Sequence, residues 1–167
     1  MRKFQSNEYT LRGATIADVP AILRCIQGLA EYERLAHECH ATEQRLRETL
    51  FGAERVAEVV LATRDTETAG FALWFRNYST FLAQPGIYLE DLFVFPEHRG
   101  HGLGRRLFGH LARIAAERGY GRVEWAVLDW NEDAIRFYRS LGAVAMDDWT
   151  TFRLTGDALA ALGVAMI

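Results

Sequence analysis

The sequence predicts an α/β (mixed α+β) fold, built as a mixed, mostly antiparallel twisted sheet with helices on both faces. The expected elements follow the order β-α-α-β-β-β-α-β-α-β, in which a block of strands passes into βαβ units. Apolar residues recur at helical spacing in residues 16–30 and 103–115. The 167 residues, half of them hydrophobic, suffice for one full core and show no repeat or linker. We therefore expect a single domain over residues 1–167.

The first third of the chain is predicted to form one short strand and two helices. Residues 9–13 can form the strand. Thr15, followed three residues later by Asp18, is a capping signal for a helix that continues to about residue 34. Thr42 can cap a second helix that ends near Gly52.

The middle of the chain is predicted to form three strands and a long helix. Residues 56–64 and 69–78 are separated by four polar residues and predict a hairpin, and residues 86–95 predict a third strand. The helix over residues 103–118 has an apolar face, and Gly119 ends it.

The last third is predicted to hold three more strands and two short helices. Residues 122–128 alternate apolar and other side chains, as expected of a strand. Asn131 can cap a short helix that Gly142 follows. Residues 143–146 and 149–154 then predict two strands before a small final helix.

Composition limits the class of protein. The net charge of −3 argues against a nonspecific nucleic-acid partner. Cys25 and Cys39 form no paired-cysteine motif, which favours a reducing compartment. Residues 1–9 are mostly polar and lack a signal-peptide pattern, and the apolar residues 158–167 are too few to span a bilayer. We expect a soluble cytoplasmic protein that contacts neither membrane nor nucleic acid.

Two neighbouring features point to chemistry. Glu90 and Asp91 stand together inside an apolar strand. Burial of two adjacent carboxylates costs free energy unless they are solvated or paired. Gly100, Gly102 and Gly104 follow that strand and open a helix, where backbone N–H groups can cradle a phosphate. The combination predicts an enzyme with a phosphorylated cofactor.

Two common phosphate motifs do not fit this loop. A dinucleotide fingerprint needs glycine where Arg105 stands. A P-loop needs Lys and Ser or Thr after Gly109, but His110 and Leu111 follow. A turn that uses glycine only for positive φ is the remaining alternative, and the three alternate glycines with flanking arginines favour the anion site over it. His98 and His101 beside the loop are expected to hydrogen-bond locally.

The loop residues 99–104 closely resemble the acetyl-CoA pyrophosphate motif of the GNAT superfamily of N-acetyltransferases. Residues 88–94, with Tyr-Leu-Glu-Asp, and residues 127–143, with Asp-Trp-Asn, are similar to its diamine acetyltransferase branch, which includes spermidine/spermine and thialysine acetyltransferases. Residues 29–33 also resemble that branch. The similarity runs from about residue 11 to residue 154.

The resemblance implies a set of site residues, acetyl-CoA as cofactor, a small amine as substrate and a homodimer. Backbone groups of Leu92, Phe93 and Val94 would pair with the pantetheine arm, and Asn131 and Ala134 would flank the cofactor. The pyrophosphate would be held by the loop and its neighbours: Arg99, Gly100, His101, Gly102, Leu103, Gly104 and Arg105. Tyr138 would lie beside the thioester sulfur and contact the cofactor. The amine site would be lined by Tyr32, Glu33, Glu90 and Asp91.

The chemistry of acetyl transfer gives two of these residues catalytic roles. An alkylammonium has a pKa of ~10.4, so the neutral amine costs roughly 4–5 kcal/mol at pH 7. Glu90 is expected to accept that proton, with Asp91 raising the carboxylate pKa by like-charge repulsion. Tyr138 can donate a proton to the leaving thiolate. Transfer would be direct, within a ternary complex.

Each assignment has a structural alternative. Tyr138 could be a core residue, Asn131 could serve only as a cap, and Tyr32 and Glu33 could simply end the first helix. The cluster at residues 37–40, His-Glu-Cys-His, matches no closed zinc site, and no metal is expected.

The acceptor is the most open part of the prediction. Polyamine-acetylating members carry an acid where this chain has Ser79, which favours short amino-acid-like amines over spermine. A protein or drug amine as acceptor, or a non-catalytic acyl-CoA sensor, remain as alternatives.

Overall fold

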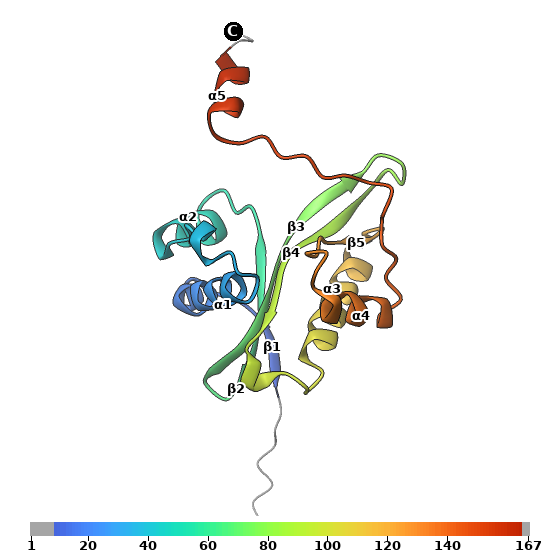
Figure 1. Cartoon of the computed structure of the whole chain (residues 1–167). Helices are drawn as coiled ribbons and strands as arrows, with labels where there is room; N and C mark the ends of the chain where they lie inside the picture. Colours follow the sequence, from blue (N-terminus) through green and yellow to red (C-terminus); the bar gives the residue numbers. More distant parts are fainter. Residues whose placement is uncertain (1–8, 165–167) are drawn as a thin grey trace, which may run out of the picture. The chain divides into compact units, whose positions relative to one another are not determined.

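The computed structural model describes residues 9–164 (Figure 1). The chain divides into two compact units, Met1–Trp130 and Asn131–Ile167, and each is described here by itself. That the whole chain is a single domain stays a prediction.

The first unit is built on a five-stranded sheet with the strand order β1-β2-β3-β4-β5. The first four strands are antiparallel neighbours, and β5 runs parallel to β4. The strands are β1 (Thr10–Gly13), β2 (Glu58–Arg64), β3 (Glu67–Ser79), β4 (Gln84–Val94) and β5 (Val123–Glu124). The sequence-based prediction of a mixed, mostly antiparallel sheet is confirmed.

Helices cover both faces of this sheet, as predicted (Figure 1). One face carries α1 (Val19–Tyr32) and α2 (Glu43–Phe51), and the other carries α3 (Leu103–Arg118). Three short 3-10 helices lie at η1 (Ile16–Asp18), η2 (Ala36–Glu38) and η3 (Pro96–His98). The second unit holds α4 (Glu132–Ser140) and α5 (Gly156–Val164).

The main core lies between α1, α2 and the sheet. Its buried members come from both helices, from β2 to β4 and from the residue before β2: Val19, Ile22, Cys25, Leu46, Leu50, Ala57, Val59, Leu61, Phe71 and Phe93. Each large apolar side chain buried in this way contributes roughly 1.5–3 kcal/mol. Cys25 is fully buried with a free thiol, and desolvation raises its pKa to about 12.

The predicted caps form as expected. Asp18 accepts a hydrogen bond from the Thr15 N–H at 2.8 Å and a two-pronged ion pair from Arg12 at 2.7 and 2.8 Å. Thr42 Oγ1 accepts the N–H of Arg45 at 3.3 Å, which starts α2. These local bonds satisfy donors that a helix start would otherwise leave unpaired.

Two expectations for the strands are wrong. The strand predicted over residues 122–128 is only two residues long, because its pairing with β4 ends at Tyr88 and Glu124, just before β4 departs from regular register. Residues 143–146 and 149–154 form no strand. Their large side chains, such as Val144 and Phe152, are exposed, and within residues 9–164 no neighbouring strand pairs with them. A strand cannot form without such a partner.

Candidate active site

The glycine loop adopts the backbone that an anion site needs. Gly100 and Gly102 have φ of +78° and +72°, a region that other residues rarely adopt. Gly102 is the N-cap of α3, and Leu103, Gly104 and Arg105 form the first turn of that helix. A Cβ added at Gly100 or Gly102 would meet no protein atom within 4 Å, so the loop is open on its outer side. The N–H groups of a first helical turn lack partners within the helix, and this arrangement fits a diphosphate.

Neighbouring side chains brace the loop. Arg99 Nε donates to the carbonyl oxygen of Val94 at 2.9 Å, which ties the loop to the end of β4. The Arg99 guanidinium lies 5.0 Å from the ring centre of Tyr32 and 5.7 Å from that of Phe93. His101 Nδ1 bonds the carbonyl oxygen of His98 at 3.3 Å, so the predicted local role is confirmed for His101, whereas the His98 ring lies 3.2 Å from the hydroxyl of Tyr9, far away in the sequence. Tyr32, predicted for the amine site, therefore contacts a residue predicted for the cofactor.

The edge of β4 that faces β5 fits a linear amide chain. Leu92, Phe93 and Val94 pair with β3 on one side, at Ala72, Phe71 and Gly70. On the other side β5 pairs with β4 only at Ile87 and Tyr88. Within residues 9–164, that edge of β4 from residue 92 to residue 94 has no strand partner. A pantetheine arm could bond such an edge as an added strand does.

A β-bulge separates the two acidic residues of β4. Asp91 pairs with Leu73, while Leu89 pairs with Trp74, so Glu90 between them has no partner in the ladder. Directly paired residues point to the same face of a sheet. Asp91 therefore points with Leu73 toward the face that carries α1 and the core, whereas Glu90 is exposed.

The environment of Asp91 favours its protonated form. Burial, followed by the negative charges of Glu90 and Glu33, raises the pKa of Asp91 to about 7. Glu33 immediately follows α1, and burial raises its pKa as well. Two carboxylates thus act on a third, Asp91, in a partly desolvated place. Such a place holds a proton or a bound cation far better than bulk water does.

An aromatic group that the sequence did not single out lies beside Tyr32. The Tyr32 and Trp130 ring centres are 6.2 Å apart, and the Arg34 guanidinium lies 5.4 Å from the Trp130 ring. Trp130 is half exposed. In the sequence this tryptophan stands out only as part of the Asp-Trp-Asn segment that carries the family resemblance.

The remaining predicted residues lie in the second unit. Asn131 Oδ1 accepts the N–H of Ala134 at 3.3 Å and caps α4, as predicted. Tyr138 lies one turn further along α4, where its ring centre is 5.5 Å from that of Phe137. One short helix therefore carries three of the predicted cofactor residues.

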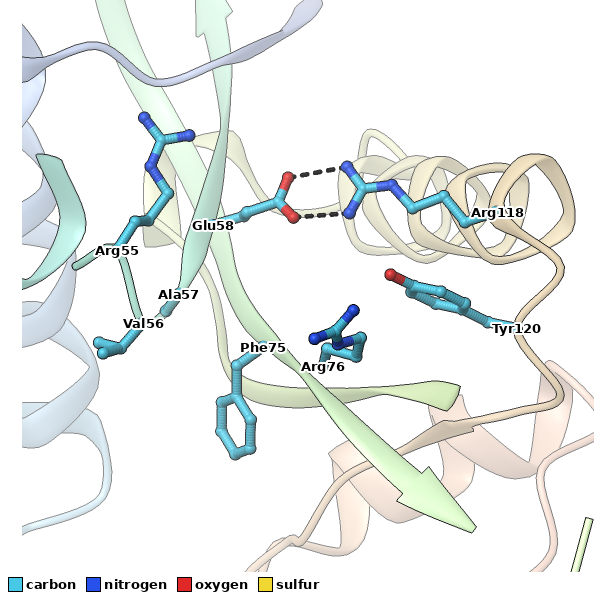
Figure 2. Close-up of a pocket in the computed structure, with 8 residues that line it drawn as sticks. All are labelled: Arg55, Val56, Ala57, Glu58, Phe75, Arg76, Arg118 and Tyr120. Atoms are coloured by element: carbon cyan, nitrogen blue, oxygen red, sulfur yellow. Dashed lines mark hydrogen bonds and ion pairs between the residues drawn. The ribbon is translucent and has the colours of Figure 1, made fainter. Parts of the chain in front are cut away.

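A separate pocket shares no residue with the predicted site. Its volume is about 330 Å³, and Figure 2 shows its lining: Arg55, Val56, Ala57, Glu58, Phe75, Arg76, Arg118 and Tyr120. Arg118 forms a two-pronged ion pair with Glu58 at 2.6 and 2.9 Å, and its guanidinium lies 5.0 Å from the Trp74 ring. This pair joins the end of α3 to the start of β2, and hydrogen bonding to Glu58 raises the pKa of Arg118.

The fold and the site define an acetyltransferase. Residues 25–143 match the acetyltransferase (GNAT) family, and the chain belongs to that family. It is 34% identical to L-ornithine N5-acetyltransferase of Arabidopsis thaliana over 91% of this chain and 86% of that protein. It is also 34% identical to thialysine N-epsilon-acetyltransferase of Mus musculus over 89% of this chain and 94% of that protein. These relatives confirm the resemblance to the diamine acetyltransferase branch.

A solved structure has the same fold. It is an integron cassette protein of V. cholerae, with a TM-score of 0.79 and 25% identity over 93% of this chain and 97% of that one. As to membranes, none of the helices in residues 9–164 has the length and apolar character to cross a bilayer.

Proposed function

We propose that this enzyme transfers the acetyl group of acetyl-CoA to the primary amine of a small cationic molecule. The observation that carries the proposal is the acidic group of Glu33, Glu90 and Asp91, in which Glu33 and Glu90 act on buried Asp91 and Glu33 directly follows Tyr32. Tyr32 in turn contacts Arg99 at the start of the glycine loop. A cation site and a diphosphate site are therefore neighbours within one unit.

The acidic group can remove the proton that blocks attack. An ammonium must lose a proton before its nitrogen can react, and a base with a pKa near the working pH removes it most effectively. The sequence assigns this role to Glu90. We propose that Asp91, with a pKa of about 7, receives the proton first, and that exposed Glu90 passes it to solvent.

Other residues hold the cofactor and supply the second proton. Acetyl-CoA, when bound, supplies the acetyl thioester. Backbone N–H groups of residues 100–105 would bind its diphosphate, and backbone groups of Leu92 to Val94 would bind its amide arm. The resemblance assigns the proton for the leaving thiolate sulfur to the Tyr138 hydroxyl, and it implies that Asn131 and Ala134 would flank the cofactor. The amine attacks directly within a ternary complex, so orientation supplies much of the acceleration.

The proposed acceptor is a short amino acid with a side-chain amine. Two relatives are named for ornithine and thialysine, which are molecules of this kind. Ser79, which stands where polyamine-acetylating members carry an acid, removes one anchoring charge for a long polycation. The alternatives are a protein or drug amine as acceptor, or an acyl-CoA sensor without turnover.

Thiol release from acetyl-CoA tests the proposal directly. The purified protein is mixed with acetyl-CoA and ornithine, thialysine, lysine, spermidine or spermine. We expect the highest kcat/KM with the amino acids. Preference for spermine would contradict the acceptor but leave acetyl transfer intact. Binding of acetyl-CoA without turnover of any amine would favour the sensor.

Two further expectations come from the sequence: the composition suggests a location, and the resemblance implies an oligomeric state. A cytoplasmic location and a homodimer remain predictions, and sedimentation of the protein at micromolar concentration tests the second. A monomer would contradict it.

A further inference from the structure

Two acidic side chains and a buried histidine meet at the end of the sheet, outside the proposed active site. They are Glu67, the first residue of β3, and Glu97 and His98 of η3. One ligand atom from each lies within 4.8 Å of the other two. His98 is only 1% exposed, while Glu67 and Glu97 reach solvent. The sequence analysis expected no metal, and only the fold brings these residues together.

The two nitrogens of the His98 ring have different surroundings. Nδ1 lies 3.2 Å from the Tyr9 hydroxyl oxygen, which is close enough for a hydrogen bond. Nε2 is buried and has no hydrogen-bond partner among residues 9–164. A buried polar atom without a partner destabilises the fold, and a bound ligand would remove that cost.

The carboxylate of Glu67 lies too far from His98 Nε2 for a hydrogen bond, but at a suitable distance for a shared metal ion. Glu67 Oε1 lies 3.6 Å from His98 Nε2, beyond hydrogen-bond range. Two ligands held about 2.1 Å from one zinc ion, at an angle of about 110–120°, lie roughly 3.4–3.6 Å apart.

We propose that Glu67, Glu97 and His98 bind one divalent transition-metal cation, such as Zn²⁺. His98 Nδ1–H donates to the Tyr9 hydroxyl, and this tautomer leaves the Nε2 lone pair for the metal, as metal-binding histidines usually require. The two carboxylates neutralise the ion, and water completes its coordination. Glu67 offers Oε1, because its Oε2 lies 3.7 Å from Arg64.

The position of the site gives it a structural consequence. His98 immediately precedes Arg99, where the glycine loop begins. A cation held by Glu67 and His98 ties the start of β3 to that loop. Metal binding would therefore stabilise the loop without taking part in acetyl transfer.

Calorimetric titration of the metal-free full chain with ZnCl₂ tests the proposal. We expect one zinc ion per chain, and we expect Glu67→Gln and Glu97→Gln each to weaken binding about tenfold or more. His98→Gln should abolish binding, and Co²⁺ should give a visible absorption band that this variant loses. Glu54→Gln, an exposed substitution elsewhere, is the matched control, and His37→Gln controls for the histidine-rich segment at residues 37–40.

The result that overturns the proposal is equally clear. Absence of stoichiometric zinc binding would overturn it, as would equal affinity in the wild type and both glutamate variants, or loss of binding in His37→Gln. Because Glu67 and Glu97 are exposed, their variants decide the question even where His98→Gln fails to fold.

Discussion

Arg99 donates from Nε to the carbonyl oxygen of Val94 at 2.9 Å, so the first residue of the glycine loop is bonded to the last residue of β4. The same guanidinium lies over the rings of Tyr32 and Phe93. One side chain therefore connects the proposed diphosphate site, the proposed amide edge and the proposed amine site. Its planar group makes these contacts together, which an ammonium cannot do.

The first prediction concerns these contacts of the Arg99 side chain. Arg99→Lys keeps the charge but loses the planar group, so we expect the Kd for acetyl-CoA to rise by roughly five- to tenfold, about 1–1.4 kcal/mol. Calorimetry measures the change. Arg113→Lys, an exposed substitution on α3, is the control and should bind normally. Equal acetyl-CoA affinity in Arg99→Lys and Arg113→Lys would show that the Arg99 contacts do not support cofactor binding.

The second prediction concerns the loop backbone. Gly102→Val should weaken acetyl-CoA binding sharply, because a β-branched residue resists a φ of +72° and projects toward the cofactor. The added side chain would meet no protein atom, so the effect is expected from backbone strain and from the cofactor itself. Gly109→Ala, inside α3 where space is open, should bind normally and stabilise the helix by up to ~1 kcal/mol.

The third prediction separates catalysis from packing at Tyr138. Tyr138→Phe keeps the ring next to Phe137 and removes one hydroxyl. We expect kcat to fall by roughly 10²-fold, as for loss of a general acid, with little change in cofactor Kd or Tm. A lower Tm with unchanged kcat would instead mark Tyr138 as a structural residue.

The fourth prediction concerns pH at Asp91. Its folded pKa of about 7 lies above the unfolded value of 3.8, so the folded state holds the extra proton between these values. Below about pH 4 Asp91 is protonated in both states, so its ionisation costs the folded state nothing. The free energy of unfolding then falls as the pH rises from about 4 toward 7. Asp91→Asn removes that cost and should stabilise the protein at pH 8 by on the order of 2 kcal/mol, measured by urea unfolding.

The same variant should lose activity, because the amide cannot accept a proton. In the wild type, kcat/KM should rise through about pH 7, and Asp91→Asn should flatten this rise. Glu90→Gln is the comparison: loss of its exposed carboxyl should change kcat, and loss of its charge should lower the pKa of Asp91 and stabilise the fold less than Asp91→Asn does. Full activity in Asp91→Asn would instead assign the role of proton acceptor to Glu90.

The fifth prediction concerns Ser79, which stands where polyamine-acetylating members carry an acid. Ser79 is only 4% exposed, and its Oγ accepts the N–H of Leu82 at 3.2 Å in the turn after β3. Ser79→Asp would bury a carboxylate and should destabilise the protein by roughly 1–3 kcal/mol. Thr80→Asp, at the exposed neighbouring position, is the control and should leave Tm unchanged.

Local chemistry in the sequence predicted the helix boundaries well. Thr42 and Asn131 cap α2 and α4 because capping needs only residues within one turn. Residues 143–154 were mispredicted for the opposite reason. Their apolar alternation is a strand pattern, but a strand also needs a neighbour that pairs with it.

The site was predictable as a list of residues but not as an arrangement. The adjacency of Glu90 and Asp91 is plain in the sequence, whereas the bulge that buries one and exposes the other depends on pairing with β3. The proximity of Glu67 to His98 depends on the fold, which brings the start of β3 next to η3. No sequence pattern at either position signals it.

The depth of Cys25 has a practical consequence for the laboratory. With its thiol enclosed in the core and its pKa near 12, Cys25 is a poor nucleophile toward alkylating or disulfide reagents. Cys39 is the only other cysteine in the chain and is partly exposed. Colorimetric detection of released coenzyme thiol should therefore carry a background of at most one sulfhydryl per chain. Cys39 likewise offers a single attachment point for a fluorescent or spin label, without any need to engineer the sequence.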